Sequence, residues 1–215
     1  MARQRLSSEP VQKEPREPRP RGRPRAYDPA QALAAATGAF WLAGYSATSL
    51  DALSEATGMN RPSLYGAFGD KRALYLQALQ AYADAGQQAM RSALAPEWPL
   101  REGLKRVYDT ALKIYYPPQQ AARGCLLIGT AATEALQDDE IRALLQRSLR
   151  TYDAEFERRF VQAQAAGELR TDADPVLLAR LASALLHTLA LRSRAGDART
   201  QLAATAAAGI EQLLR

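Results

Sequence analysis

Apolar residues recur every three or four positions along most of the chain after residue 28. Side chains with this spacing share one face of an α-helix, whereas a strand needs an alternation that no stretch of the sequence shows. The first such segment begins at Pro29 and is stopped by Gly44. Its inward positions are Leu33, Ala36, Phe40 and Ala43. The pattern therefore predicts an all-α protein.

The same periodicity predicts further helices toward the C-terminus. A long helix is expected from a cap at Asp70 to about Leu94, and five more follow it. They occupy residues 99–116, residues 124–136, a stretch from Asp138 or Asp139 to Gly167, a stretch beginning at Asp174-Pro175, and a last one beginning at Asp197. Residues 124–136 are almost all apolar or small, so we expect them to be buried on all sides.

Residues 48–71 predict two short helices joined at a tight corner. Thr48 or Ser49 can cap the first helix, and Gly58 can supply the left-handed turn that ends it. Asn60 is suited to cap the second helix. The positions expected to point inward are Leu50, Leu53, Ala56, Met59, Leu64 and Phe68. Two helices joined at a glycine, with a polar outer face on the second, form a helix-turn-helix that fits the major groove of DNA.

The stretch GMNRPSLYGAFGDKRALY, residues 58–75, resembles the recognition helix and the following helix of the TetR family of repressors. The shorter stretch Arg123-Gly124-Cys125-Leu126-Leu127 resembles one sub-group of that family. The resemblance implies a three-helix DNA-binding domain, residues 28–82, followed by a helical bundle for effector binding and dimerisation, residues 83–215. It also implies a dimeric repressor that leaves an inverted-repeat operator in double-stranded DNA when a small molecule enters the body.

The outer face of the second hairpin helix carries the side chains expected to read DNA. Arg61 can donate two hydrogen bonds to O6 and N7 of guanine, and Pro62 and Ser63 suit a thymine methyl and a base edge or phosphate. Tyr65 and Lys71 match positions that hold phosphates in the family. The full set predicted to contact DNA is Arg23, Arg25, Thr48, Ser49, Asn60, Arg61, Pro62, Ser63, Tyr65, Gly66 and Lys71.

Positive charge is concentrated at the N-terminus. Residues 1–27 hold eight Arg or Lys and three Glu, a net charge of +5, whereas the remaining residues hold 20 of each sign. Prolines and few large apolar side chains leave this segment unable to form a core, so we predict a disordered basic arm. Its Arg23 and Arg25 can lie in a narrow minor groove. The alternative is a solubilising tail with only non-specific attraction to phosphates.

The last two predicted helices are more apolar than one core-facing stripe requires. This excess predicts a homodimer in which they form a four-helix bundle with the partner's copies. The alternative is burial within one chain. The residues predicted to form the dimer interface are Leu181, Leu185, Leu189, Leu202, Ala206 and Ile210.

Several residues of the body are candidates to line an effector pocket. Cys125 lies at a predicted helix N-terminus, where a thiol can be reactive, although a small buried apolar role is the alternative. Glu134 is the one charge in its apolar segment, so it is either paired internally or faces a cavity. The predicted pocket residues are Tyr108, Tyr115, Cys125, Glu134, Tyr152 and Phe156.

Composition argues against several other functions. One cysteine and one histidine exclude the common zinc clusters and an intrachain disulfide, and no nucleotide-binding or nucleophile motif appears. His187 lies in a leucine-rich helix, where a satisfied core or interface histidine is expected. We therefore predict no enzymatic activity, no cofactor and no metal.

The N-terminus has no apolar signal segment, and the apolar run at residues 176–191 is interrupted by Arg180 and His187. We expect a cytoplasmic protein without a membrane partner. Two alternatives to a ligand-released repressor stay open. One is a DNA-binding architectural protein without an effector, and the other is a thiol-based sensor acting through Cys125.

Overall fold

The computed structural model describes residues 27–215, which form helices and no strand. The predicted arm, including Arg23 and Arg25, lies outside these residues except for Tyr27. The elements are α1 (Pro29–Ala43), α2 (Leu50–Thr57), α3 (Arg61–Phe68), α4 (Lys71–Ala93), α5 (Leu100–Tyr115), the π-helix η1 (Leu127–Ala131), α6 (Ala132–Glu134), α7 (Asp139–Ala165), α8 (Pro175–Ala195) and α9 (Arg199–Leu213). The predicted all-α class is confirmed for this part of the chain.

Short polar side chains begin most of these helices, because they accept hydrogen bonds from N–H groups that have no partner in the first turn. The capping residues are Asp28, Ser49, Asn60, Asp70, Asp138 and Asp174. Of the two candidates for α2, Ser49 is the cap, and its hydroxyl accepts the N–H of Ala52 at 3.0 Å. The last helix begins one residue later than expected, since Ala198 and not Asp197 holds its cap position.

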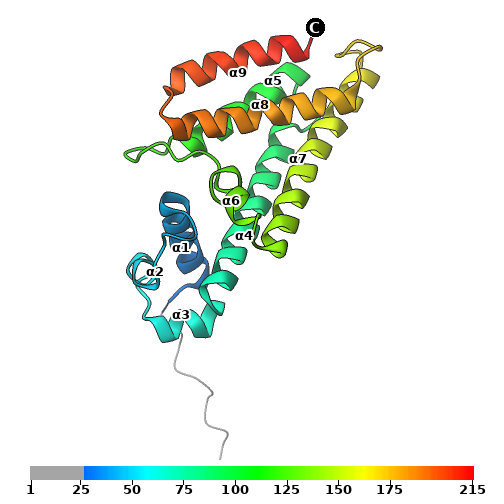
Figure 1. The fold of residues 1–215 in the computed structure, drawn as a ribbon. Coiled ribbons are helices and arrows are strands. Elements are labelled where there is room, and N and C mark those ends of the chain that lie inside the picture. The colour runs from blue at the N-terminus through cyan, green and yellow to red at the C-terminus, as the bar shows by residue number, and fades with distance from the viewer. Residues whose placement is uncertain (1–26) are drawn as a thin grey trace, which may run out of the picture.

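Helix α4 connects the two ends of the molecule. It packs against α1 and α3 and also against α5 and α7. In Figure 1, α1, α2 and α3 gather around the start of α4, whereas α8 and α9 lie at the opposite end. The predicted domain boundary after residue 82 falls within α4, so one continuous helix crosses it. The domain limits themselves stay a prediction.

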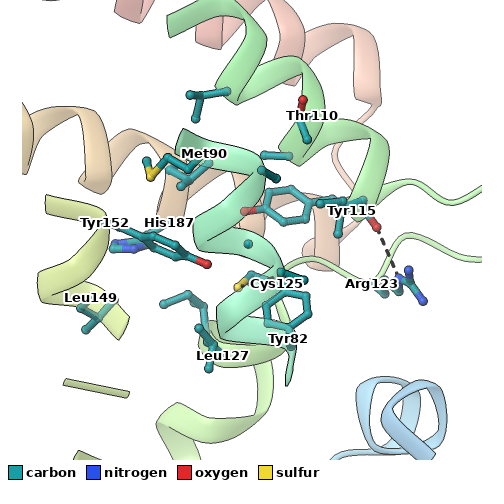
Figure 2. A pocket seen from close by; sticks show the side chains of 18 of the residues that line it. Tyr82, Met90, Thr110, Tyr115, Arg123, Cys125, Leu127, Leu149, Tyr152 and His187 are labelled. Atoms are coloured by element: carbon teal, nitrogen blue, oxygen red, sulfur yellow. Dashed lines mark hydrogen bonds between the residues drawn. The ribbon is translucent and has the colours of Figure 1, made fainter. Parts of the chain in front are cut away.

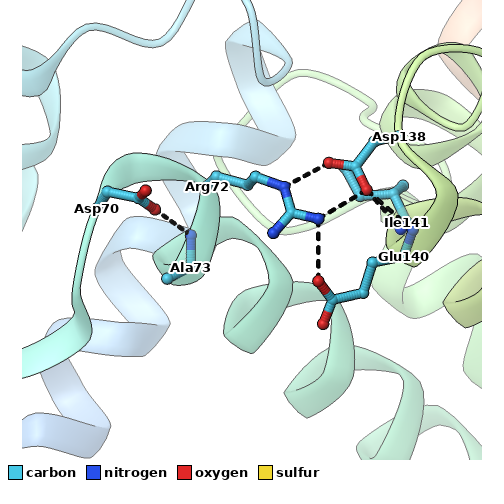
Figure 3. Close-up of polar contacts among 6 residues, drawn as sticks. All are labelled: Asp70, Arg72, Ala73, Asp138, Glu140 and Ile141. Atoms are coloured by element: carbon cyan, nitrogen blue, oxygen red, sulfur yellow. Dashed lines mark hydrogen bonds and ion pairs between the residues drawn. The ribbon is translucent and has the colours of Figure 1, made fainter.

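A charged contact ties the start of α4 to the start of α7 (Figure 3). One guanidinium nitrogen of Arg72, Nη2, donates to Asp138 and to Glu140, at 2.9 Å in both cases. The Nε of Arg72 donates to the other oxygen of Asp138. These hydrogen bonds from Arg72 hold the pKa of Asp138 at about 2, below its usual value. Because Asp138 also caps α7, this contact fixes the first turns of both helices relative to each other.

Aromatic side chains fill the space between α1 and α4. The rings of Phe40 and Tyr75 meet edge to face at 5.0 Å, and the ring of Tyr45 lies 4.9 Å from that of Tyr75. The hydroxyl of Tyr75 is hydrogen-bonded to that of Thr130 in η1 at 2.7 Å. Helix α1 and the start of α4 are thus joined to the body through η1.

Residues 124–136 differ from the single buried helix that was predicted. They contain the π-helix η1 and the short α6, and Leu136 at their end is 81% exposed. The prediction of burial on all sides is therefore wrong for the C-terminal part. The N-terminal part of this segment is buried, because Gly124, with φ +64°, packs directly against the carbonyl of Ala190 in α8. Nothing in residues 27–215 covers Leu136 in the same way.

Two other inward predictions are also wrong. Ala43 and Ala56 are exposed, whereas Phe40 and Leu53, three residues earlier, are fully buried. Both alanines lie in the last turn of their helix, where the buried stripe ends.

Candidate DNA-binding surface and effector cavity

Helices α2 and α3 form the predicted helix-turn-helix. Gly58 ends α2 in the left-handed conformation, with φ 66°, and Met59 is buried in the corner. Leu64 and Phe68 bury the inner face of α3. Its outer face is exposed and consists of Asn60, Arg61, Pro62, Tyr65 and Gly66, with Ser63 half-buried. Local sequence signals therefore place these side chains as predicted.

Arg61 is paired within the hairpin. Its Nη2 and Nε donate to the same oxygen of Asp51, at 2.6 Å and 3.1 Å, and these hydrogen bonds raise the pKa of Arg61. Asp51 lies in the first turn of α2, so the pair joins the two helices across their outer side. Asp51 engages Nε and one N–H of Nη2, so Nη1 and the second N–H of Nη2 stay available for bidentate donation to guanine while the pair holds the guanidinium in place.

The predicted contacts at the hairpin edges separate into two groups. The side chain of Thr48 is buried, and its hydroxyl donates to the carbonyl of Gly44 at 2.6 Å, so it supports the loop and does not face outward. The prediction that Thr48 contacts phosphate is therefore corrected. Ser49 is exposed at the start of α2. Lys71 is half-buried, with its ammonium 4.5 Å from the centre of the Tyr45 ring.

A cavity of about 290 Å³ lies in the body (Figure 2). It is bounded by α4, α5, α7, α8, η1 and the segment before η1, and it also reaches Trp41 of α1. The lining residues are Trp41, Tyr82, Ala85, Gly86, Ala89, Met90, Val107, Thr110, Ala111, Ile114, Tyr115, Arg123, Cys125, Leu127, Ile128, Leu149, Tyr152, Leu186 and His187.

Of the predicted pocket residues, Tyr115, Cys125 and Tyr152 line this cavity. Their hydroxyl and thiol groups surround its middle in Figure 2. Burial raises the pKa of the Cys125 thiol, which favours the protonated form. The hydroxyl of Tyr82 donates to its sulfur at 3.4 Å. This burial supports the role of Cys125 as a small buried apolar residue more than its role as a reactive thiol.

Three predicted pocket residues lie elsewhere. Tyr108 is buried and donates to the carbonyl of Ala182 at 3.1 Å, and Phe156 is fully buried in the core beside it. Glu134 accepts a hydrogen bond from Ser46 at 3.1 Å, so it joins α6 to the loop before α2. Of the two roles that the sequence left open for Glu134, the internal contact is the one observed.

Sequence reasoning missed Trp41, the cavity residue contributed by α1. Its Nε1 donates to the carbonyl of Gly124 at 3.1 Å, the guanidinium of Arg123 lies 3.8 Å from its ring centre, and the ring of Tyr82 meets it at 4.8 Å. The side chain therefore joins α1, α4 and the Arg-Gly-Cys segment at one point. Its helical spacing alone did not distinguish it from an ordinary core residue.

His187 was expected to be a satisfied core or interface residue, and the structure corrects this. Its Nε2 is buried and lacks a hydrogen-bond partner among residues 27–215, and the side chain lines the cavity. Burial lowers the pKa of His187, with a smaller opposing effect from Asp153. The signal available in the sequence was a lone histidine among leucines, which does not reveal an unpaired nitrogen.

The predicted dimer residues also divide into two groups. Leu181 is 50% exposed and Leu185 is half-buried, whereas Leu189, Leu202, Ala206 and Ile210 are buried within the chain's own core. The prediction that the last four form the dimer interface is therefore wrong. They are buried where α8 and α9 pack against each other and against α5 and α7 of the same chain. The exposed valine, leucine and alanine side chains of α8 and α9 are Val176, Leu177, Leu181, Ala184, Leu191, Ala195, Ala203, Ala204, Ala207 and Ala208.

The described residues also bear on metal binding and on membrane insertion. Within residues 27–215 no group of three or more His, Cys, Asp or Glu could hold a metal ion. In the same part of the chain one helix, α8, is long and apolar enough to cross a membrane by length and composition alone. This helix packs against α5, α7 and α9, as a core helix does.

Two family models match the chain. The first, described as bacterial regulatory proteins of the tetR family, matches residues 32–78, which include α2 and α3. The second, described as a tetracyclin repressor-like C-terminal domain, matches residues 101–208, which include the cavity-forming helices α5, α7 and α8.

Similar proteins carry regulatory names. The transcriptional repressor ComR of Escherichia coli is 29% identical over 82% of this chain and 84% of its own length. The transcriptional regulator AcuR of Cereibacter sphaeroides is 31% identical over 79% of this chain and 78% of its own. A cysteine mutant of the TetR-family regulator CifR, solved with 26 bp operator DNA, is 31% identical, with a TM-score of 0.79 over 88% of this chain and 98% of that one. The chain belongs to the TetR family and is a DNA-binding transcriptional regulator.

Proposed function

We propose that this regulator is a homodimeric repressor that binds an inverted-repeat operator and releases it when a small molecule enters the cavity. The repressor name of the relative ComR favours repression over the architectural alternative. The observation that carries the proposal is the position of Trp41. This side chain belongs to α1, which packs on α2, and it is also part of the cavity wall.

A ligand in the cavity would therefore touch both halves of the molecule. It would contact Trp41 on α1 and Tyr82 and Gly86 on α4, and both helices pack against the hairpin. A ligand shifts an equilibrium only by its difference in affinity for the two states. The proposed effector binds better when α1 and α4 take a spacing that the operator does not accept, so the operator and the effector weaken each other by the same factor.

Dimerisation through α8 and α9 supports the choice of an inverted repeat. The exposed leucines Leu177 and Leu181 lie one turn apart on α8, and the exposed alanines of α9 allow close approach of a second helix. A two-fold axis at this end would turn both copies of α3 toward one side of the DNA. The half-site centres would then lie roughly 34–36 Å apart, or a multiple of one helical turn.

We propose that DNA is contacted by the exposed face of α3 and by flanking groups. Arg61 reads a base, Tyr65 and Lys71 hold phosphates, and Ser49 lies at the other edge. Asn60, Pro62, Ser63 and Gly66 complete the surface. The basic segment with Arg23 and Arg25 adds charge that the neutral remainder lacks, which would make binding strongly dependent on salt.

Screening small molecules by thermal shift, followed by operator release, tests this proposal. A ligand at 100 times its Kd stabilises the protein by about 2.7 kcal/mol. The informative variant is Ala89→Phe, which fills the cavity, and the matched control is Ala81→Phe, at an exposed position of the same helix outside the cavity. We expect Ala89→Phe to bind the operator but to resist release, whereas the control behaves as the parent. Equal release of both variants would show that the effector acts elsewhere.

A further inference from the structure

The chemistry of the cavity wall limits the molecules that it can hold, given the proposed function above. No aspartate or glutamate occurs among the residues that line it, all of which belong to the described part of the chain. A cation placed there would lose its water without gaining a countercharge. The wall therefore disfavours ammonium-type ligands.

Anions are disfavoured for a related reason. The one cationic lining residue is Arg123, and its guanidinium is already stacked on Trp41, with Nε donating to the carbonyl of Ile114 at 3.3 Å. Figure 2 shows this group pointing away from the middle of the cavity. A carboxylate near Cys125 would therefore be buried without a close cation.

Apart from Arg123, the polar side chains of the cavity wall are uncharged. Burial lowers the pKa of His187, so its ring is neutral near pH 7, and Asp153 on α7 is the charged group that acts on it. The Nε2 of His187 is buried without a partner among residues 27–215. In Figure 2 the hydroxyls of Tyr115 and Tyr152 point toward the middle of the cavity, and His187 lies at its edge beside the Tyr152 ring. A bound molecule can satisfy these groups by hydrogen bonding.

Size gives the remaining limit. The cavity of about 290 Å³ corresponds to roughly ten water-sized volumes, so it suits a compact ligand. Most of its wall is apolar, with Met90, Val107, Leu127 and Leu186 among the lining side chains. Such a wall gains most from a ligand with an apolar body.

We propose that the effector is a small uncharged alcohol or phenol whose hydroxyl hydrogen-bonds to Nε2 of His187 while its apolar body fills the cavity. A hydroxyl both donates and accepts, so it fits either tautomer of the neutral imidazole. The inference rests on the cavity being the effector site, but the choice of ligand class depends on the wall residues alone.

Four probes of similar shape test the ligand class: benzyl alcohol, ethylbenzene, benzoate and benzylammonium. Their Kd values are measured with the full chain by calorimetry and by the fluorescence of Trp41 in a Trp98→Phe background, which leaves one tryptophan. We expect benzyl alcohol to bind at least about tenfold more tightly than either charged probe. Equal binding of benzoate or benzylammonium, or binding of none of the four, would overturn the proposal without any cavity mutation.

The role of His187 is tested by the preference between two uncharged probes. In His187→Leu, the preference for benzyl alcohol over ethylbenzene should fall by about tenfold relative to the parent, since one hydrogen bond to a buried group is lost. His187→Gln, which keeps a hydrogen-bonding group, should retain most of the preference. Tyr115→Phe is the matched control that removes another cavity hydroxyl. An unchanged preference in His187→Leu, or the full loss in Tyr115→Phe alone, would contradict the assignment.

Operator release is measured separately in the same variants. If benzyl alcohol binds with the expected preference but leaves operator affinity unchanged, the ligand class stands and the release mechanism fails. If charged compounds release the operator through the cavity, the release mechanism stands and the ligand class is wrong.

Discussion

Replacing Gly124 with alanine should destabilise the protein through two separate effects. The first is backbone strain, because φ is +64° and a residue with a side chain pays about 1–2 kcal/mol in the left-handed region. The second is overlap, because a Cβ would lie 2.4 Å from the carbonyl oxygen of Ala190, a backbone atom of α8. Relieving such overpacking costs about 1–3 kcal/mol. The free energy of unfolding should therefore fall by about 2–5 kcal/mol in total.

Gly167→Ala is the matched control for strain alone. Its φ is +75°, and a Cβ there meets nothing within 4 Å, so only the backbone cost of about 1–2 kcal/mol applies. For a chain of this size 1 kcal/mol lowers Tm by about 2–4 °C, so Gly124→Ala should lose about 4–20 °C and Gly167→Ala about 2–8 °C.

Calorimetry of both variants measures this difference, and near-UV circular dichroism reports whether Trp41 keeps its bond to the Gly124 carbonyl. Equal losses of Tm would refute the close packing of α8 on the Arg-Gly-Cys segment.

Four other outcomes are expected. Arg61→Ala should weaken operator binding by about 5- to 150-fold and relax the preference at one base pair of each half-site, and an unchanged preference across operator variants would exclude direct readout. Leu177→Glu with Leu181→Glu should give a folded monomer by light scattering that no longer binds the full operator; a variant that stays dimeric would place the interface elsewhere. Cys125→Ser should retain release by a non-covalent ligand, whereas loss of all release together with loss of sensitivity to oxidants would favour the thiol sensor. The pKa of Asp138 is about 2 in the folded chain and 3.8 ordinarily, so its stabilising charge is present above pH 3.8 and is lost as pH falls toward 2. Stability followed by circular dichroism should therefore fall more steeply in this range for the parent than for Asp138→Asn, and identical profiles would contradict the contact with α4.

The helix-turn-helix was predictable because its determinants are local. Asn60 caps α3, Gly58 turns the chain and Met59 fills the corner, and each of these roles depends on neighbours only a few residues away. The burial of Thr48 was not predictable, since its hydroxyl bonds to Gly44 and not to the helix that follows. Short-range signals specify where a helix begins, but two adjacent hydroxyl residues compete for one cap.

Membership of the cavity could not be predicted from helical spacing. Tyr115 and Tyr152 line the cavity while Tyr108 and Phe156, one or two turns away on the same helices, are packed solidly. Spacing identifies an inward face, but whether two inward faces meet or leave space depends on how helices cross. The dimer residues failed for the same reason. In α8 the apolar positions cover two faces, and the sequence does not indicate that Leu189 meets the chain's own core while Leu181 faces outward.

The contact of Arg72 with Asp138 and Glu140 has a mechanical consequence. It anchors α4 near residue 72, at the end closest to the hairpin. A tilt of α4 about this point therefore moves its far end much more than the end that packs on α3. Gly86 lies ~21 Å along the helix from this anchor, so a tilt of ~5° moves the cavity wall by ~2 Å while leaving the first turn almost still. A displacement of α4 at the cavity would therefore cause only a small displacement of the hairpin. Trp41 offers a shorter route, because it belongs to α1 and lines the cavity, so a displacement of its side chain would act on α1 directly.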